Sequence, residues 1–306
     1  MPESTRQLRF SLPSNVPTLR SYAVLVLAVA GLLLAPPAAL TAQDAPVFDP
    51  GCPLPFAKIA TSHPIDGNCG IEGKEASDDA NHAQNRAKNN FCAQGDPVPV
   101  TQADFVGLQA AVDKAGIPSG SPKKLPADRK VLLNLFTTSG GATIGEGTKV
   151  RFVAFVLKAH YSDVGSGEAV NCGQKGNEPN DIHIPTVQDM SDEECASITA
   201  EMSPHSRPAG WTPKALTTPG VPMRITGQLF FDGSHKPCTE GQSRNPKRAA
   251  SWEIHPVYAV DVCNASTLAE CPIADDSKWR PLVAEPGASA PPAPSGASGK
   301  RVQPLH

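Results

Sequence analysis

Two stretches of the sequence place a histidine two residues after an acid, in patterns typical of β-strands. Asp181 precedes His183 in "NDIHI", and Glu253 precedes His255 in "SWEIHPVYAVDVC". Side chains two apart on a strand point to the same side, so each acid shares a face with its histidine. Imidazoles and carboxylates gathered in this way can bind a divalent metal such as zinc, or can act as a general acid and base.

Other polar residues in neighbouring segments can join this face. Glu201 in "ITAEM" lies opposite Ala200 and Met202 on its predicted strand. His235 occupies the loop before the strand of Glu253, and a second loop, "SPHSRPAGW", can close the patch from the other side. The predicted metal ligands are His183, His235 and His255, the predicted ligand-binding residues are Asp181, Glu201, Arg207, Trp211 and Trp252, and Glu253 is the predicted catalytic base.

The same groups also have a purely structural interpretation. Glu253 can form an ion pair with Arg224 or Arg248 across strands, and His255 can be an ordinary edge residue before a proline. The chain contains no H-E-x-x-H motif, nucleophile elbow or Walker loop. The residue types alone therefore leave open a metal site, an acid and base pair, or a structural network.

The elements that carry these residues predict a mainly β fold with a small α-helical N-terminal segment. Five strand-like segments, with the longest interruption after the third, match the order of an OB-like five-stranded barrel. A β-sandwich is the alternative. Gly227 in the middle of the fourth segment predicts a bend or bulge. The five segments are residues 148–161, 180–187, 195–202, 221–232 and 251–263.

The rest of the chain divides by composition. A basic region, the apolar run 23–35 and small residues near Ala42 predict a signal peptide over residues 1–42. Alanines at helical spacing and Thr101 as an N-cap predict a helical segment over 43–125. The barrel is expected over 126–272, and a disordered Pro/Ala/Gly-rich tail over 273–306.

The eight cysteines predict a disulfide-stapled protein in an oxidising compartment. Cys263 is expected to pair with Cys271, and Cys69 with Cys52 or Cys92. We expect a secreted or periplasmic protein with no membrane span in its mature chain, because the apolar run is shorter than a bilayer requires. The net charge of −3 and the aromatic content of 5% argue against strong nucleic-acid binding.

Three strand motifs resemble those of a set of uncharacterised bacterial secreted proteins. These proteins share a D-x-H-I strand, a V-R-x-T-G-x-L-x-x-D strand and a W-E-I-H-P strand. The corresponding residues here are Asp181 and His183; Arg224, Thr226, Gly227, Leu229 and Asp232; and Trp252 to Pro256. The resemblance covers roughly residues 149–263. It implies a secreted barrel-like domain and implies no activity.

The leading functional prediction is a secreted protein that binds a ligand, an oligosaccharide or another envelope or extracellular molecule, through the polar face. The first alternative is a metal-dependent hydrolase, such as a phosphodiesterase or nuclease, in which Glu201 is a further metal ligand. The second alternative is a structural envelope protein whose polar face only packs against the helical segment.

Overall fold

The computed structural model describes residues 69–74, 79–120, 127–208 and 210–282. The predicted signal peptide therefore lies outside the described residues, as do 283–306 of the predicted tail. Among the described residues, no helix is both long and apolar enough to cross a lipid bilayer.

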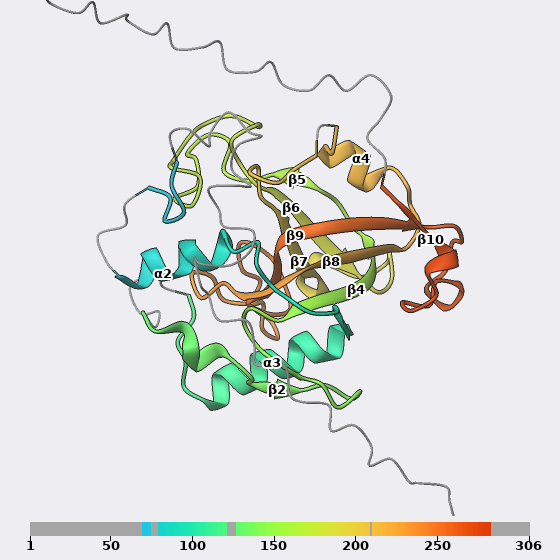
Figure 1. Cartoon of the computed structure of the whole chain (residues 1–306), viewed down its shortest axis with the longest axis horizontal. Coiled ribbons are helices and arrows are strands. Elements are labelled where there is room, and N and C mark those ends of the chain that lie inside the picture. The colour runs from blue at the N-terminus through green and yellow to red at the C-terminus, as the bar shows by residue number, and fades with distance from the viewer. Residues whose placement is uncertain (1–68, 75–78, 121–126, 209, 283–306) are drawn as a thin grey trace, which may run out of the picture. The chain divides into compact units, whose positions relative to one another are not determined.

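Five strands close into a barrel (Figure 1). Around the barrel the order is β4-β8-β9-β7-β6, and β6 pairs back with β4. The β7–β9 pair is parallel, and the other four pairs are antiparallel. This connectivity is that of an OB-type barrel, so the predicted fold is confirmed. The strands are β4 (Lys149–Val156), β6 (Ile182–Val187), β7 (Ile198–Met202), β8 (Met223–Phe231) and β9 (Trp252–Cys263).

The barrel interior is filled by the apolar residues that alternate along these strands. Phe152, Ile184, Ala200, Ile225 and Ile254 all belong to one buried cluster. Burial alternates strictly along β4, whereas every residue of β6, β7 and β8 is buried. Strands β6, β7 and β8 are therefore covered on both faces, unlike the strands of a sheet that has one face in water.

Gly227 occupies an irregularity in β8, as predicted. The register between β8 and β9 shifts on both sides of this residue. A Cβ atom at Gly227 would lie 2.5 Å from Ile254 Cγ2 and 2.5 Å from the carbonyl oxygen of Pro256. The close approach of the two backbones at this bend therefore requires glycine.

Smaller elements surround the barrel. A capping box formed by Thr101 and Asp104 starts α3, as predicted, and Phe105 of that helix meets Phe152 with ring centroids 5.3 Å apart. A short α4 fills the connection between the third and fourth barrel strands, where the OB-type fold usually has a helix. These elements are α2 (Asp79–Lys88), α3 (Gln102–Lys114), α4 (Pro213–Thr217), β1 (Val98–Val100), β2 (Phe136–Thr137), β3 (Thr143–Ile144), β5 (His160–Tyr161) and β10 (Trp279–Pro281).

A 3₁₀ helix, Arg129–Leu132, precedes β2. The predicted start of the tail at residue 273 is wrong, because β10 pairs with β9 and Leu282 is buried. The Pro-rich composition that marks the tail begins only after these residues, so composition placed the boundary too early.

Three disulfides fasten the described part of the chain: Cys69–Cys172, Cys195–Cys238 and Cys263–Cys271. The predicted Cys263–Cys271 pair is confirmed. The prediction that Cys69 pairs with Cys52 or Cys92 is wrong, because its partner lies 103 residues further along the chain. Sequence proximity favoured a local pair, whereas the fold brings the segment before α2 against the long connection between β5 and β6.

Candidate functional site

The predicted polar face lies on the outside of the barrel, where it is covered. The strand neighbours Ile182, Ala200 and Ile254 belong to the core, so the histidines and acids point the other way, as the alternation predicts. This outer face is shielded from water, since the exposed fraction is 6% for Glu201 and 0% for His255. Helix α2 and the connection 162–181 contribute the side chains that cover it.

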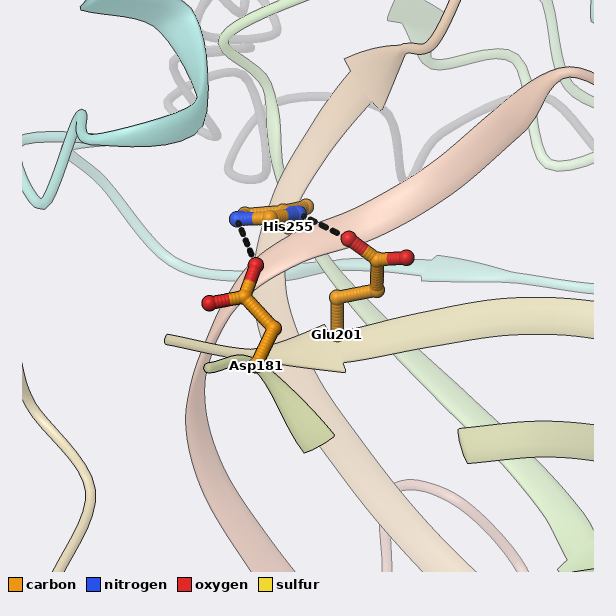
Figure 2. Close-up of side chains that lie close together, drawn as sticks. All are labelled: Asp181, Glu201 and His255. Atoms are coloured by element: carbon orange, nitrogen blue, oxygen red, sulfur yellow. Dashed lines mark hydrogen bonds and ion pairs between the residues drawn. The ribbon is translucent and has the colours of Figure 1, made fainter. Parts of the chain in front are cut away.

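Three side chains from adjacent strands converge in this buried layer. Asp181 immediately precedes β6, Glu201 lies on β7 and His255 lies on β9 (Figure 2). The imidazole of His255 is 2.8 Å from Glu201 Oε2 through Nδ1, and 3.6 Å from Asp181 Oδ2 through Nε2. One potential ligand atom from each residue lies within 4.8 Å of the other two. We call these three residues the triad.

Several buried atoms at the triad lack a hydrogen-bond partner. They include Asp181 Oδ2, His255 Nε2 and both ring nitrogens of His183. The nearest charged atom to His183 is Glu201 Oε1, 3.6 Å from its Nε2 atom. Buried polar atoms almost always find partners in folded proteins, so these unpaired atoms are candidates for contact with a further group.

The electrostatics of the triad separate its two acids. Burial, together with the nearby Glu168 and Glu201, raises the pKa of Asp181 well above its usual value. Burial alone would also raise the pKa of Glu201, but Lys88 and the hydrogen bond from His255 outweigh it and hold that pKa well below its usual value. Glu201 is therefore the fixed anion of the cluster, and Asp181 is an acid that a cation would help to ionise.

His183 is kept neutral by its surroundings, which predicts a pH dependence. Burial lowers the pKa of His183 to about 4. The folded-state pKa is thus below the unfolded value near 6.5, so the folded protein binds fewer protons in this window. The contribution of His183 to stability is complete above about pH 6.5 and declines by about 3 kcal/mol as the pH falls to 4.

Comparison of the wild-type protein with His183→Gln in the presence of a chelator isolates this contribution. The difference in unfolding free energy between the two proteins, from urea titrations at pH 7 and pH 4, should shift by about 3 kcal/mol against the wild type at the lower pH. A difference that does not change with pH would show that the imidazole is not held neutral.

A series of paired charged residues leads from the triad to the surface. Arg248 pairs with Glu253, and it donates to Asp232 Oδ2 at 2.7 Å. His235 Nδ1 lies 2.8 Å from the same Asp232 oxygen, and its side chain is 48% exposed. Glu253 Oε2 lies 3.9 Å from His255 Nδ1, which is too far for a hydrogen bond. His235, a predicted metal ligand, therefore lies at the outer end of this series of charged residues and outside the triad.

The ion pair of Glu253 agrees with one part of the structural interpretation. Its partner is Arg248, one of the two arginines considered, whereas Arg224 pairs with Asp261 and Asp276. Burial and Glu201 raise the pKa of Glu253 well above its usual value, even beside Arg248. Glu253 Oε2 has no hydrogen-bond partner. One carboxylate oxygen of Glu253 therefore pairs with Arg248, and the other has no hydrogen-bond partner.

The three other predicted ligand-binding residues stand apart from the triad. Arg207 donates to the carbonyl oxygens of Glu178 and Asn180 at 2.6 and 2.9 Å, and so holds the backbone that leads into Asp181. Trp211 donates to the carbonyl oxygen of Leu282. Trp252 is corrected as a ligand contact, because it is fully buried in the apolar core on the opposite side of β9 from His255.

Three residues around the triad were missed in the sequence, namely Lys88, Glu168 and Asn171. Asp232 belongs to one of the strand motifs but had no predicted role. Lys88 ends an alanine-rich helix, where a basic residue is expected simply to favour the helix dipole. Glu168 and Asn171 lie in an irregular connection with no periodicity. No local pattern marks these residues as buried.

Three cavities of the described residues lie away from the triad. A cavity of about 820 Å³ opens beside α4 and the Cys263–Cys271 loop, and one of about 400 Å³ lies between the start of α3 and the segment 268–273. A third, of about 160 Å³, lies between α2 and residues 127–133. None of these three is lined by a triad residue.

The fold and the site together define an OB-type barrel that carries a buried cluster of imidazoles and carboxylates on its outer face. No protein-family model, no curated protein and no solved structure matches the chain.

Proposed function

We propose that this protein is an exported binding protein whose ligand is a divalent transition-metal ion, held by Asp181, Glu201 and His255. One observation carries the proposal. The three potential ligand atoms lie within 4.8 Å of one another, and both Asp181 Oδ2 and His255 Nε2 are buried without a hydrogen-bond partner. Mixed nitrogen and oxygen donors suit zinc or manganese.

The spacing of the donors is compatible with one ion. Ligand atoms of a tetrahedral zinc ion lie about 3.3 Å apart, because each bond is about 2.0–2.2 Å long. Binding of one ion would draw the three ligand atoms closer than the 4.8 Å within which they lie. His183 is not one of these three residues, but its Nε2 atom lies 3.6 Å from Glu201 Oε1, and both of its ring nitrogens are unpaired.

The charge balance favours a cation. Asp181, Glu168 and Glu253 are acids whose pKa values are raised by burial and by the negative charge of Glu201. A dication at the triad replaces the protons that these acids would otherwise keep, so ion binding and proton release are coupled. A neutral sugar would offer no such compensation, which favours a metal ion over the oligosaccharide of the leading sequence prediction.

The position of the triad also supports a binding role. OB-type barrels bind ligands on their second and third strands and on the loops after the first and fourth strands. Here these are β6, β7, the connection 157–181 and the connection 232–251, the source of every residue in the triad except His255. This argument is an analogy between folds. The disulfides fit an extracellular protein, and the apolar run 23–35 supports export.

Metal-assisted hydrolysis is a second candidate. It is favoured by Glu253, a buried acid with a raised pKa and a free Oε2 atom 3.9 Å from His255. Such a group can serve as a general base beside a metal. Because Glu253 is only 1% exposed, a phosphodiester has no direct access to it in this conformation. We therefore prefer metal binding to metal-assisted hydrolysis as the proposed function.

Calorimetric titration of chelator-treated protein with zinc and with manganese tests the proposal. The wild-type protein should bind about one equivalent of one of these ions. Asp181→Asn, which keeps the shape and removes the charge, should bind at least about 10-fold more weakly. Asp189→Asn, a change at an exposed acid outside the cluster, should bind like the wild type. Failure of the wild-type protein to bind either ion would refute the proposed function.

A further inference from the structure

Lys88 is a largely buried cation in direct contact with the triad. Its Nζ atom lies 3.5 Å from Glu201 Oε2, and its side chain is only 14% exposed. The same ammonium lies 5.7 Å from the centre of the Phe230 ring, which also packs against His255. The oxygen that faces Lys88 is the one that accepts the 2.8 Å hydrogen bond from His255. Lys88 therefore faces the same carboxylate edge that a metal ion would use.

The backbone that carries Lys88 is fixed. Gln228 on β8 donates to the carbonyl oxygen of Ala87 at 2.9 Å, and Asn89 donates to the carbonyl oxygen of Ile71 at 2.9 Å. The first contact holds the carboxyl end of α2 against the barrel, and the second holds it against the segment 69–74. The four-carbon stem of lysine remains flexible. The ammonium can thus approach or leave Glu201 without movement of the helix.

Lysine at this position stabilises the acids when they have no other cation. The Lys88 ammonium lies 3.5 Å from Glu201 Oε2, so the two groups form an ion pair in the metal-free protein. A second cation within a few ångströms of it, in an environment that excludes water, is repelled strongly.

We infer that Lys88 is a built-in competitor of the metal ion for Glu201, and that it sets the affinity of the triad so that the ion is bound reversibly. This inference rests on the proposed function. The ion and the ammonium share one carboxylate, so binding of the ion requires Lys88 to withdraw toward the solvent-exposed side of its stem. Lys88 is thus an affinity-determining residue and supplies no bond to the ion.

Zinc titration of Lys88→Met, a variant with a similar unbranched stem and no charge, tests the inference. The metal-free variant should be less stable than the wild type, and it should bind zinc at least about 10-fold more tightly because the repulsion is gone. Lys158→Met is the matched control. Lys158 is 51% exposed and pairs with Glu194 away from the triad, so its removal should leave zinc affinity unchanged.

The outcomes separate this inference from the proposed function. If the wild type binds zinc and Lys88→Met binds it equally or more weakly, the competition is refuted and the metal site stands. If only Lys88→Met binds zinc, the competition is supported and the proposed function of the native chain is refuted. If neither binds zinc, both fail. If Lys88→Met folds neither with nor without zinc, Lys88→Gln is titrated instead. If Lys88→Gln also fails to fold in both conditions, Lys88 is a structural residue and the inference is refuted.

Discussion

Replacement of Arg248 by methionine is expected to lower the free energy of unfolding by about 3–5 kcal/mol. Arg248 is fully buried and is the shared partner of Glu253 and Asp232. Methionine preserves most of the volume but leaves two buried acids without their cation. Glu253 can take up a proton, since its pKa is already raised. Asp232 keeps its contact with His235 Nδ1 at 2.8 Å, which favours the charged form, so it remains a buried anion that has lost its arginine.

The matched control is Arg224→Met. Arg224 is also buried, at 7% side-chain exposure, and it too pairs with two acids. Its partners, however, are 17% and 81% exposed and can be solvated once the arginine is removed. We expect a loss of only about 1 kcal/mol, as for pairs near the surface. Urea unfolding at pH 7 with a chelator measures both variants, and equal losses would show that burial of the Asp232–Arg248–Glu253 group does not decide its energetics.

Replacement of His255 by glutamine is expected to abolish the stabilisation of the protein by zinc. A ligand at 100 times its dissociation constant stabilises the folded state by about 2.7 kcal/mol. In the wild-type protein this gain should appear as the difference between urea titrations with zinc and with a chelator. Glutamine retains a polar side chain but removes Nε2, the unpaired atom that faces Asp181.

His82→Gln is the control for nonspecific zinc binding by imidazoles. His82 lies on α2, where its nearest acid is Glu72 at 3.9 Å, and it contacts no triad residue. This variant should keep the full stabilisation by zinc. If His255→Gln is stabilised by zinc as strongly as the wild type, the ion binds elsewhere, and the assignment of His255 as a ligand is wrong.

Strand alternation was sufficient to assign the two faces of the barrel. The period of two in "NDIHI" and "SWEIHP" separates Ile182 and Ile254 from His183 and His255, and the structure keeps that separation. The count of strands and the long interruption after the third were sufficient for the OB-type order. These features are local or depend only on order along the chain, so they can be inferred from sequence.

The environment of the polar face was decided by contacts between distant segments. Glu201 and His255 are separated by 54 residues, and the connection 162–181 and Lys88 come from outside the barrel strands. Whether a face meets water or another element depends on the packing of such segments, and no periodicity encodes it. The histidines that alternation places outside the barrel are therefore buried.

The sequence by itself determined which residues point away from the core, where the barrel strands run, and that the fourth barrel strand bends or bulges at Gly227. Only the tertiary structure decided that Asp181, Glu201 and His255 meet, that His235 lies apart from them, and that Lys88 neutralises Glu201. The physical reason is that alternation constrains direction along one strand, whereas distances between side chains depend on strand pairing and on the covering helix. A buried ion pair such as Lys88–Glu201 forms only once both partners have been removed from water together.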